Sequence, residues 1–125
     1  LAAIPQLARG MSVIGLSQGG QFLRAFVERY NDPPVYNLIT LGGQHQGVFG
    51  VPNCLAPGST NCEDARRLLN EAAYEPLSQQ HFTPANYWHD PLQPDKYVKG
   101  CVFLPDINND GSFNQTYKDN MLSIN

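Results

Sequence analysis

The chain has 125 residues, of which 42% are hydrophobic and 15% are charged, and its formal net charge is −3. This length suits one domain. The eight Lys and Arg residues are scattered, which argues against a surface that binds nucleic acid. No apolar run approaches the roughly 20 residues that a transmembrane segment needs, and no signal peptide is visible. Because the chain begins and stops in segments that both look helical, we expect a fragment truncated at both ends.

The first part of the chain carries a strand–helix–strand pattern. Residues 1–10 predict a short helix closed by a glycine, and residues 11–16 form an apolar run that predicts a strand. Residues 18–30 show helical spacing, and two prolines then end the helix. Its apolar residues predict one buried face: Phe22, Leu23, Phe26, Val27 and Tyr30. Residues 35–41 are largely apolar, as strands buried on both faces of a parallel sheet tend to be, so we expect a right-handed βαβ unit.

The junction between the first strand and the helix reads Gly15-Leu-Ser-Gln-Gly-Gly20, which contains the Gly-x-Ser-x-Gly pattern of a nucleophile elbow. Such a turn strains the serine, and glycines at positions 15 and 19 are expected to remove Cβ atoms that would collide. The Ser17 hydroxyl then stands above the sheet edge, where the helix N-terminus and the Gln18 backbone amide favour an oxyanion. We interpret Ser17 as a nucleophile; a tightly packed glycine-rich turn is the alternative.

A glycine-rich loop, residues 42–50, directly follows the second strand. Ligands of open parallel sheets collect at the carboxyl ends of the strands, so we expect this loop on the same edge as Ser17. Four of its residues are interpreted as lining a substrate groove: Gly42, Gly43, Gln44 and His45. His45 is also a candidate for a triad histidine, but in this fold the histidine follows the acid and comes late in the chain.

Beyond residue 50 the alternation of strand and helix fades, and the cysteines become the main signal. Cys54 and Cys62 are separated by residues rich in turn formers, without the paired pattern of a zinc site. We favour a local disulfide over two unlinked thiols, with a contribution of roughly 2–3 kcal/mol in the chain-entropy model. Cys101 lies in an apolar run and is expected to be a small buried thiol. Residues 63–74 predict an amphipathic helix. For the chain as a whole we expect no metal and no cofactor.

Residues 87–91 combine an aromatic side chain with a histidine and an aspartate, namely Trp88, His89 and Asp90. Such a cluster more often anchors a loop to the core than binds a ligand. Adjacent residues rarely form the oriented pair of a proton relay, so we favour a structural role for His89 and Asp90. His81 stands alone in a polar segment and carries no functional signal.

Residues 106–117 match a calcium-binding loop in part, with Asp, Asn and Asp at its first, third and fifth positions. Tyr117 stands where the bidentate carboxylate belongs, so a polar turn is favoured over a calcium site. Asn114-Gln-Thr116 is an acceptor pattern for N-glycosylation. A disulfide and a glycosylation site support one another, because both belong to a secretory route.

Five stretches resemble palmitoyl-protein thioesterases more specifically than the elbow alone does. They are residues 15–25, 37–50, 87–91, 103–108 and 114–118. Together they spread over nearly the whole chain, and the run Gly-Gly-Gln-His-Gln-Gly-Val-Phe-Gly is the most discriminating of them.

This resemblance implies part of an α/β-hydrolase fold, with the parallel-sheet core in residues 1–50 and an inserted, mainly helical segment in residues 51–125 that helps to form the acyl-binding region. It implies an enzyme of the lysosome that removes fatty acyl groups from S-palmitoylated proteins or peptides through an acyl-serine intermediate. Ser17 corresponds to the family nucleophile, and Gln18 to the residue whose backbone amide completes the oxyanion hole.

The resemblance also assigns Cys54 and Cys62 to a family disulfide and Asn114 to a glycosylation site, whereas Cys101 has no counterpart. In the family the acid, the histidine and the second oxyanion donor lie outside the part that resembles this chain. We therefore expect the fragment alone to be inactive. A lipase or carboxylesterase of the same fold is one alternative, and a non-catalytic secreted domain that binds lipid or calcium is another.

Overall fold

A computed structural model describes residues 4–50 and 60–124, without the side chains of residues 60–63, 65 and 66. Cys54 and the side chain of Cys62 lie outside the described residues, so their disulfide stays a prediction. Within the described part, no helix is long and apolar enough to cross a membrane.

The chain packs as two compact units. The first unit comprises Leu1–His45 and Ser112–Asn125, and the second comprises Gln46–Gly111. The expected division into residues 1–50 and 51–125 concerns which part is core and which is insertion in the family. Packing within this chain does not test that division, which stays a prediction.

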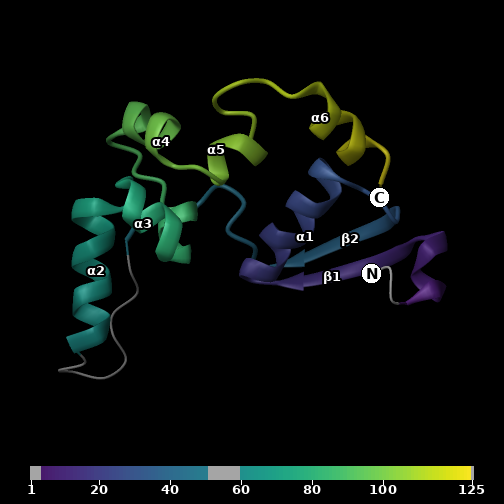
Figure 1. The fold of residues 1–125 in the computed structure, drawn as a ribbon, viewed down its shortest axis with the longest axis horizontal. Coiled ribbons are helices and arrows are strands. Elements are labelled where there is room, and N and C mark those ends of the chain that lie inside the picture. Colours follow the sequence, from purple (N-terminus) through teal and green to yellow (C-terminus); the bar gives the residue numbers. More distant parts are fainter. Residues whose placement is uncertain (1–3, 51–59, 125) are drawn as a thin grey trace. The chain divides into compact units, whose positions relative to one another are not determined.

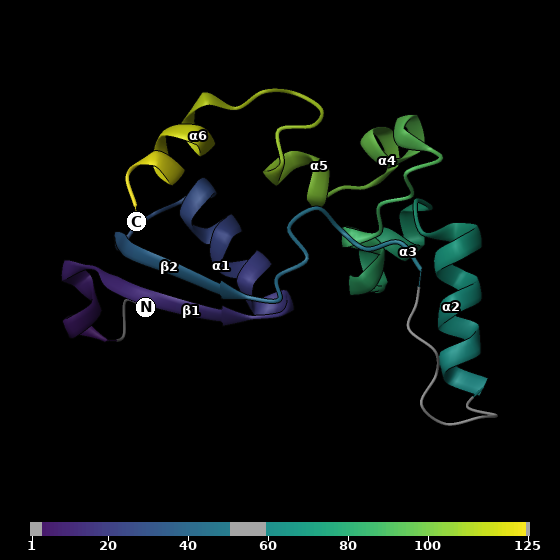
Figure 2. The same cartoon turned by 180° about the vertical axis from the view of Figure 1, so that it is seen from behind.

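The first unit is built on a parallel β–α–β arrangement (Figure 1). β1 (Met11–Leu16) and β2 (Val35–Leu41) form a two-stranded parallel sheet, and α1 (Gln18–Arg29) connects them. The 3-10 helix η1 (Pro5–Arg9) precedes β1, and α6 (Gln115–Leu122) packs against α1. The view from behind shows the same two strands side by side, with α1 on one face of the sheet (Figure 2). The predicted parallel strand–helix–strand arrangement is confirmed, with both strands at the expected bounds and the helix one residue shorter.

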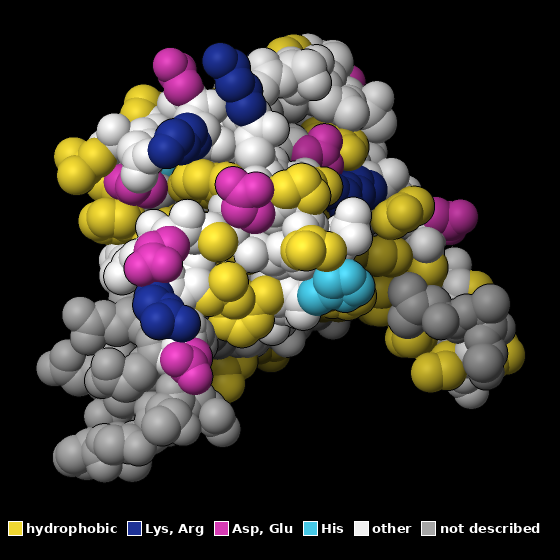
Figure 3. Space-filling model, turned by 60° about the vertical axis from the view of Figure 1, so that its left-hand side comes forward, with side chains coloured by type: hydrophobic (Ala, Val, Ile, Leu, Met, Phe, Trp, Pro, Cys, Tyr) yellow, Lys and Arg dark blue, Asp and Glu magenta, His cyan; other side chains and the backbone are white. Residues whose placement is uncertain are grey.

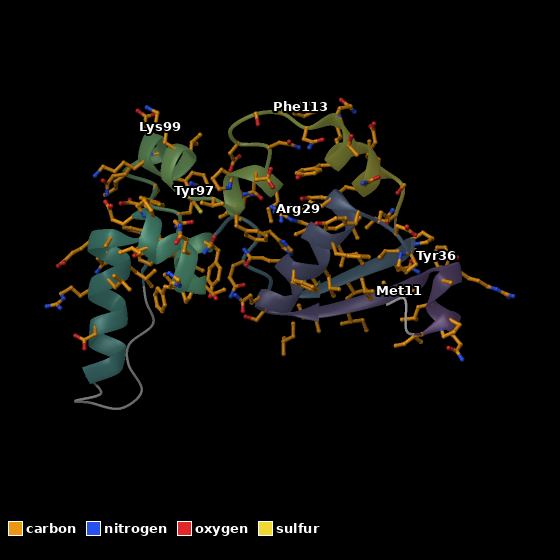
Figure 4. The ribbon with its side chains drawn as sticks, viewed as in Figure 1. Met11, Arg29, Tyr36, Tyr97, Lys99 and Phe113 are labelled. Carbon is orange, nitrogen blue, oxygen red and sulfur yellow. The ribbon has the colours of Figure 1, made fainter. Side chains whose placement is uncertain are left out.

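The other face of this sheet is open in the described structure. The register pairs Ile14 with Ile39 and Leu16 with Leu41, and all four side chains are at least 48% exposed. Side chains of the strands project away from α1 (Figure 4). The prediction of strands buried on both faces is therefore wrong for the described residues, because they supply a cover for one face alone.

The buried side of α1 matches the predicted apolar face only in part: Val27 is fully buried, but the buried sector also includes polar residues that the spacing places outside it. Phe22 and Tyr30 are 69% and 70% exposed, whereas Gln21 and Glu28 are buried. Gln21, Ala25 and Glu28 follow one another at intervals of four and three residues, so they share one helix face. Hydrophobic spacing identifies an amphipathic helix, but the surrounding elements decide which sector they cover.

α6 begins at a side-chain cap. Asn114 Oδ1 accepts hydrogen bonds from the backbone amides of Thr116 and Tyr117, at 3.0 and 3.4 Å. These amides have no acceptor inside the helix, so the cap satisfies them. Asn120 Nδ2 donates to the Glu28 carbonyl of α1 at 2.8 Å, which ties the two helices together.

The second unit is helical. Its elements are α2 (Thr60–Ala72), α3 (Pro76–His81), the 3-10 helix η2 (Thr83–Tyr87), α4 (Pro94–Gly100) and α5 (Leu104–Ile107). α2 begins and ends slightly earlier than the predicted helix at residues 63–74. On the face of the molecule in Figure 3, hydrophobic side chains lie between interspersed Lys, Arg, Asp and Glu side chains.

The core of the second unit forms around Trp88. Its side chain is 2% exposed and clusters with Leu69, Ala73 and Ala85. Its neighbours in sequence hydrogen-bond Val48 through backbone groups, at 2.9 Å to the Tyr87 carbonyl and 2.8 Å from the His89 amide. The prediction that the aromatic segment anchors a loop to the core is confirmed. Cys101 is also buried, as predicted, with its thiol 3.2 Å from the Asn86 carbonyl.

Candidate active site

Ser17 connects the end of β1 to the start of α1 in a conformation that is unusual for its residue type. Its φ is 52° and its ψ is −125°. Residues other than glycine seldom adopt positive φ, and where they do the surrounding structure must hold them. Here the Ser17 amide donates to the Leu41 carbonyl at the end of β2 at 2.8 Å, and the Gly20 amide donates to the Ser17 carbonyl at 2.9 Å. The strained turn that the sequence predicts is therefore present.

The glycines of the turn have unequal roles. A Cβ on Gly15 would lie 2.5 Å from the Gly20 nitrogen and 2.6 Å from its Cα, and a Cβ on Gly20 would lie 3.1 Å from the Thr40 Cβ. A Cβ on Gly19 would meet no atom within 4 Å. The expectation that Gly19 avoids a collision is wrong, because the first turn of the helix brings Gly20, one residue later, against Gly15.

The side chain of Gln44 reaches the nucleophile candidate from the loop that follows β2. Its Nε2 donates to Ser17 Oγ at 3.0 Å. The backbone carbonyl of Gln44 accepts a hydrogen bond from Gln21 Nε2, and Gln21 on α1 is 1% exposed. The side-chain oxygens of Gln21 and Gln44 are both buried without a hydrogen-bond partner among the described residues. This loop and α1 are thus joined beside Ser17.

His45 contacts the end of β2 instead of Ser17. Its Nε2 lies 3.0 Å from Thr40 Oγ1, and its Nδ1 is buried without a hydrogen-bond partner among the described residues. Burial lowers the pKa of His45 below its ordinary value, and the nearby Arg24 guanidinium lowers it further. The imidazole is therefore neutral near pH 7. No histidine of the described residues hydrogen-bonds Ser17, which favours the groove interpretation of His45 over a triad histidine.

The two glycines before Gln44 are explained by the same geometry. Gly42 has a φ of 61°, which glycine adopts without strain. A Cβ on Gly43 would lie 2.6 Å from His45 Nε2, so a side chain at position 43 would displace the imidazole.

Gln18 opens α1 and is exposed. Amides in the first turn of a helix have no acceptor within the helix, and the helix dipole is positive at this end. The Gln18 amide, next to Ser17 in the chain, is therefore suited to bind an anionic group close to Ser17.

The candidates of the second unit have structural partners. His89 Nδ1 donates to the Gln46 carbonyl at 2.8 Å, and its ring stacks on Tyr97 with centroids 3.8 Å apart. Asp90 is buried and accepts a hydrogen bond from the Leu92 amide at 2.8 Å. His89 and Asp90 thus bond to other groups, in agreement with the structural role expected for both.

The acidic segment around residue 110 also has a structural use. The Tyr97 hydroxyl, on a side chain labelled in Figure 4, donates to Asp110 Oδ2 at 2.7 Å. Burial raises the pKa of Tyr97 far above its usual range, and the bond to Asp110 adds to this effect. Within the described residues no three His, Cys, Asp or Glu side chains are grouped to hold a metal ion.

Sequence reasoning missed Gln21. A glutamine four residues after a serine on a helix carries no recognised pattern, and the apolar spacing of α1 predicts that position 21 lies outside the buried face. The burial of a polar residue next to the Ser17 turn is what marks Gln21 in the structure. Hydrophobic spacing does not predict that burial, so the sequence offers no signal for it.

A serine at positive φ between a parallel strand and a helix, with glycine at the tightest approach, is the turn geometry that α/β hydrolases use for a nucleophile elbow. The parallel β1–α1–β2 arrangement is a part of that fold. A family model described as palmitoyl protein thioesterase matches residues 1–125. The chain belongs to this family.

Three relatives illustrate the similarity. Palmitoyl-protein thioesterase 1 of Caenorhabditis elegans is 49% identical over 120 residues, covering 96% of this chain and 40% of the relative. Palmitoyl-protein thioesterase 3 of Dictyostelium discoideum is 42% identical over 124 residues, or 98% of this chain and 41% of the relative. Lysosomal thioesterase PPT2 of Homo sapiens is 34% identical over 113 residues, which cover 86% of this chain and 35% of the relative. This chain therefore spans about 40% of the length of the first two relatives.

Proposed function

We propose that the protein is a serine thioesterase that removes long-chain fatty acyl groups, such as palmitoyl, from cysteines of proteins or peptides. The observation that carries this proposal is the conformation of Ser17, at positive φ between β1 and α1 with its hydroxyl bonded by Gln44. The thioester substrate class comes from the names of the relatives, which are palmitoyl-protein thioesterases and a lysosomal thioesterase.

The proposed mechanism has two steps. Ser17 Oγ attacks the thioester carbonyl carbon, its proton passes to an imidazole base, and the C–S bond breaks as the cysteine thiolate leaves and takes up that proton. The Gln18 amide and a second donor stabilise the oxyanion. Water then attacks the acyl-serine with the help of the same base, which releases the fatty acid and restores Ser17.

We further propose that the acid, the histidine and the second oxyanion donor lie outside residues 1–125, so that these residues alone do not turn over substrate. His45 supports this view, because its Nε2 is engaged with Thr40 and its lowered pKa makes it a weak base. Gly42, Gly43, Gln44 and His45 are proposed to line the acyl groove, and residues 51–125 to be an insertion that contributes to it.

The proposed location is the lysosome, reached through the secretory pathway. The name of the human relative supports the location. A disulfide between Cys54 and Cys62 and glycosylation at Asn114 are parts of the same proposal. Asn114 precedes α6 at a partly exposed position in the described structure.

The test uses the protein expressed from its own gene, with whatever sequence flanks residues 1–125. A peptide with a palmitoylated cysteine and a matching peptide with a palmitoylated serine serve as substrates. Ser17→Ala should lower thioester turnover by about a thousandfold or more, because the nucleophile is lost. Ser12→Ala on the same strand, where Ser12 Oγ accepts a hydrogen bond from Asn37, is the matched control and should keep its activity.

Faster cleavage of the oxygen ester would favour a lipase or carboxylesterase. A folded protein that cleaves neither substrate, or a Ser17→Ala variant with unchanged turnover, would contradict the proposal. Serine-dependent turnover by residues 1–125 alone would contradict the proposal that the base lies elsewhere.

A further inference from the structure

The contact between Gln44 and Ser17 has a fixed direction. Gln44 Nε2 is the donor and Ser17 Oγ is the acceptor, at 3.0 Å. An amide nitrogen has hydrogen atoms to donate and no lone pair to accept with. The Ser17 hydroxyl proton therefore cannot point toward Gln44 Nε2 and is directed away from it.

The same bond restricts the side-chain rotation of Ser17. A serine hydroxyl has three staggered rotamers, and an exposed serine exchanges among them readily. Ser17 is exposed, so few packing contacts hold its side chain. A donor 3.0 Å from Oγ favours one rotamer and also stabilises negative charge on the oxygen as its proton leaves.

Gln44 is itself held through its backbone by Gln21. Gln21 Nε2 donates to the Gln44 backbone carbonyl, and Gln21 is 1% exposed on α1. The Gln21 Oε1 atom is buried with no hydrogen-bond partner among the described residues. Burying an unpartnered amide oxygen is unfavourable, so stability alone would favour an apolar residue at position 21. The contact with Gln44 gives the glutamine a use.

We propose that Gln44 is a positioning residue for the nucleophile, and that Gln21 positions Gln44. Gln44 fixes the Ser17 hydroxyl with its proton turned away from the loop, and Gln21 fixes the loop backbone that carries Gln44. This inference rests on the proposed function, because it gives Ser17 the role of nucleophile.

The first experiment compares Gln44→Ala with the parent protein on the palmitoylated cysteine peptide. Loss of the donor should lower kcat by about tenfold, because the bond acts on Ser17. A change in KM would report the separate place of Gln44 in the proposed acyl groove, so kcat is the quantity that tests the positioning. Gln21→Met should lower kcat by about threefold. It removes the hydrogen bond that holds the Gln44 backbone, but the Gln44 side chain is still present and can still donate to Ser17. Gln46→Ala is the matched control, because this glutamine is exposed in the same loop and its contact to His89 uses the backbone carbonyl.

The second experiment uses Gln44→Glu. Glutamate has nearly the same shape as glutamine, but its carboxyl group accepts a hydrogen bond when it is ionised and can donate one when it is protonated. An ionised carboxylate accepts the Ser17 proton and withdraws it from the base, so at neutral pH this variant should be slower than Gln44→Ala. A protonated carboxyl group donates again. The ratio of its kcat to that of the parent should therefore rise as the pH falls toward 4, while the ratio for Gln44→Ala stays flat.

A Gln44→Ala kcat within twofold of the parent would overturn the proposal, and so would a ratio of Gln44→Glu to parent kcat that is independent of pH. Gln44→Glu faster than Gln44→Ala at neutral pH would mean that the amide accepts from Ser17, which also contradicts it. Failure of the proposed function is distinguishable, because the parent protein would then not cleave the peptide. The labelling rate of Ser17 by a fluorophosphonate would still report the positioning, with the same order of variants expected.

Discussion

Among the residues that the structure describes, two glutamines are buried, one in each unit, and their hydrogen bonds differ. Gln79 in the second unit is 7% exposed and uses its whole amide group. Its Nε2 donates to the carbonyls of Ala73 and Ala85 at 2.7 and 2.8 Å, and its Oε1 accepts from the Val102 amide at 2.9 Å. Gln79 thereby links the residue that follows α2, the middle of η2 and the segment that follows α4.

Gln21 in the first unit is more deeply buried and less well satisfied. Its Nε2 bonds the Gln44 carbonyl, while its Oε1 has no partner among the described residues. The two side chains are chemically identical, so the difference lies in their surroundings. Gln79 bonds three backbone groups, namely the Ala73 and Ala85 carbonyls and the Val102 amide. Only Gln21 lies beside a strained residue, four positions after Ser17. A fully satisfied buried amide indicates a packing role, and a half-satisfied one beside a reactive group indicates a role in the site.

The largest expected effect follows from removing the satisfied glutamine. Gln79→Met removes the side-chain partners of the Ala73 carbonyl, on a buried residue, and of the Val102 amide. The Ala85 carbonyl loses Gln79 as well but still accepts from the Trp88 amide at 3.3 Å. The free energy of unfolding should fall by roughly 3–5 kcal/mol, because each unpaired buried group carries a desolvation cost. Urea denaturation measures this, and Gln80→Met, at an exposed position on the same helix, is the control.

Gln21→Met is the counterpart and should change the free energy of unfolding by less than about 1 kcal/mol. It removes one hydrogen bond but also removes the buried oxygen that has no partner, and these effects offset each other. If both methionine variants lose equal stability, the distinction between the two glutamines is wrong.

We expect an intermediate loss of stability when a methyl group is added to Gly15, at the elbow near the end of β1. A Cβ on Gly15 would overlap the backbone of Gly20 at 2.5 Å, and backbone atoms cannot move aside as a flexible side chain can. Gly15→Ala should therefore lower the free energy of unfolding by about 2–3 kcal/mol, measured by urea denaturation.

Gly19→Ala is the matched control for the elbow, because its Cβ would enter open space. Alanine also favours a helix over glycine, so this variant should be as stable as the parent or more stable by about 0.5 kcal/mol. Equal losses for both variants would mean that the elbow is not closed by the contact between Gly15 and Gly20.

The smallest effect is a pH dependence that belongs to the first unit. The folded pKa of His45 lies below its ordinary value of 6.5, so between these two values the unfolded chain binds more protons than the folded one. His45 should therefore lower the free energy of unfolding as the pH falls from 7 through this window. Urea midpoints at several pH values should show a weaker dependence for His45→Gln. A variant with the full dependence of the parent would assign the effect to other groups.

The backbone of the first unit could be predicted closely from the sequence. β1 and β2 are short runs of apolar residues bounded by glycine or proline, and Ser17 with its glycines specifies the turn between β1 and α1. These features are local, so a single stretch of chain determines each of them. The interpretation of Cys101 as a buried thiol is of the same kind, because its apolar neighbours mark it.

The contacts that distinguish the site could not be predicted from the sequence. The bond from Gln44 to Ser17 joins residues 27 positions apart and depends on a side-chain rotamer. The exposure of Phe22 and Tyr30 depends on what covers α1, and helical spacing does not report that. The choice of Gly20 over Gly19 as the close contact of Gly15 depends on how the first helical turn is wound.

The cap of α6 has a consequence for the study of glycosylation. Asn114 holds the helix through Oδ1, and a glycan on this residue would be attached through Nδ2, so one side chain serves two purposes with two different atoms. The customary Asn→Gln exchange would remove the helix cap together with the attachment point, and a folding defect would be mistaken for the loss of a sugar. Thr116→Ala removes the acceptor pattern and leaves Asn114 bonded to the backbone amide of residue 116. That variant separates the sugar from the cap.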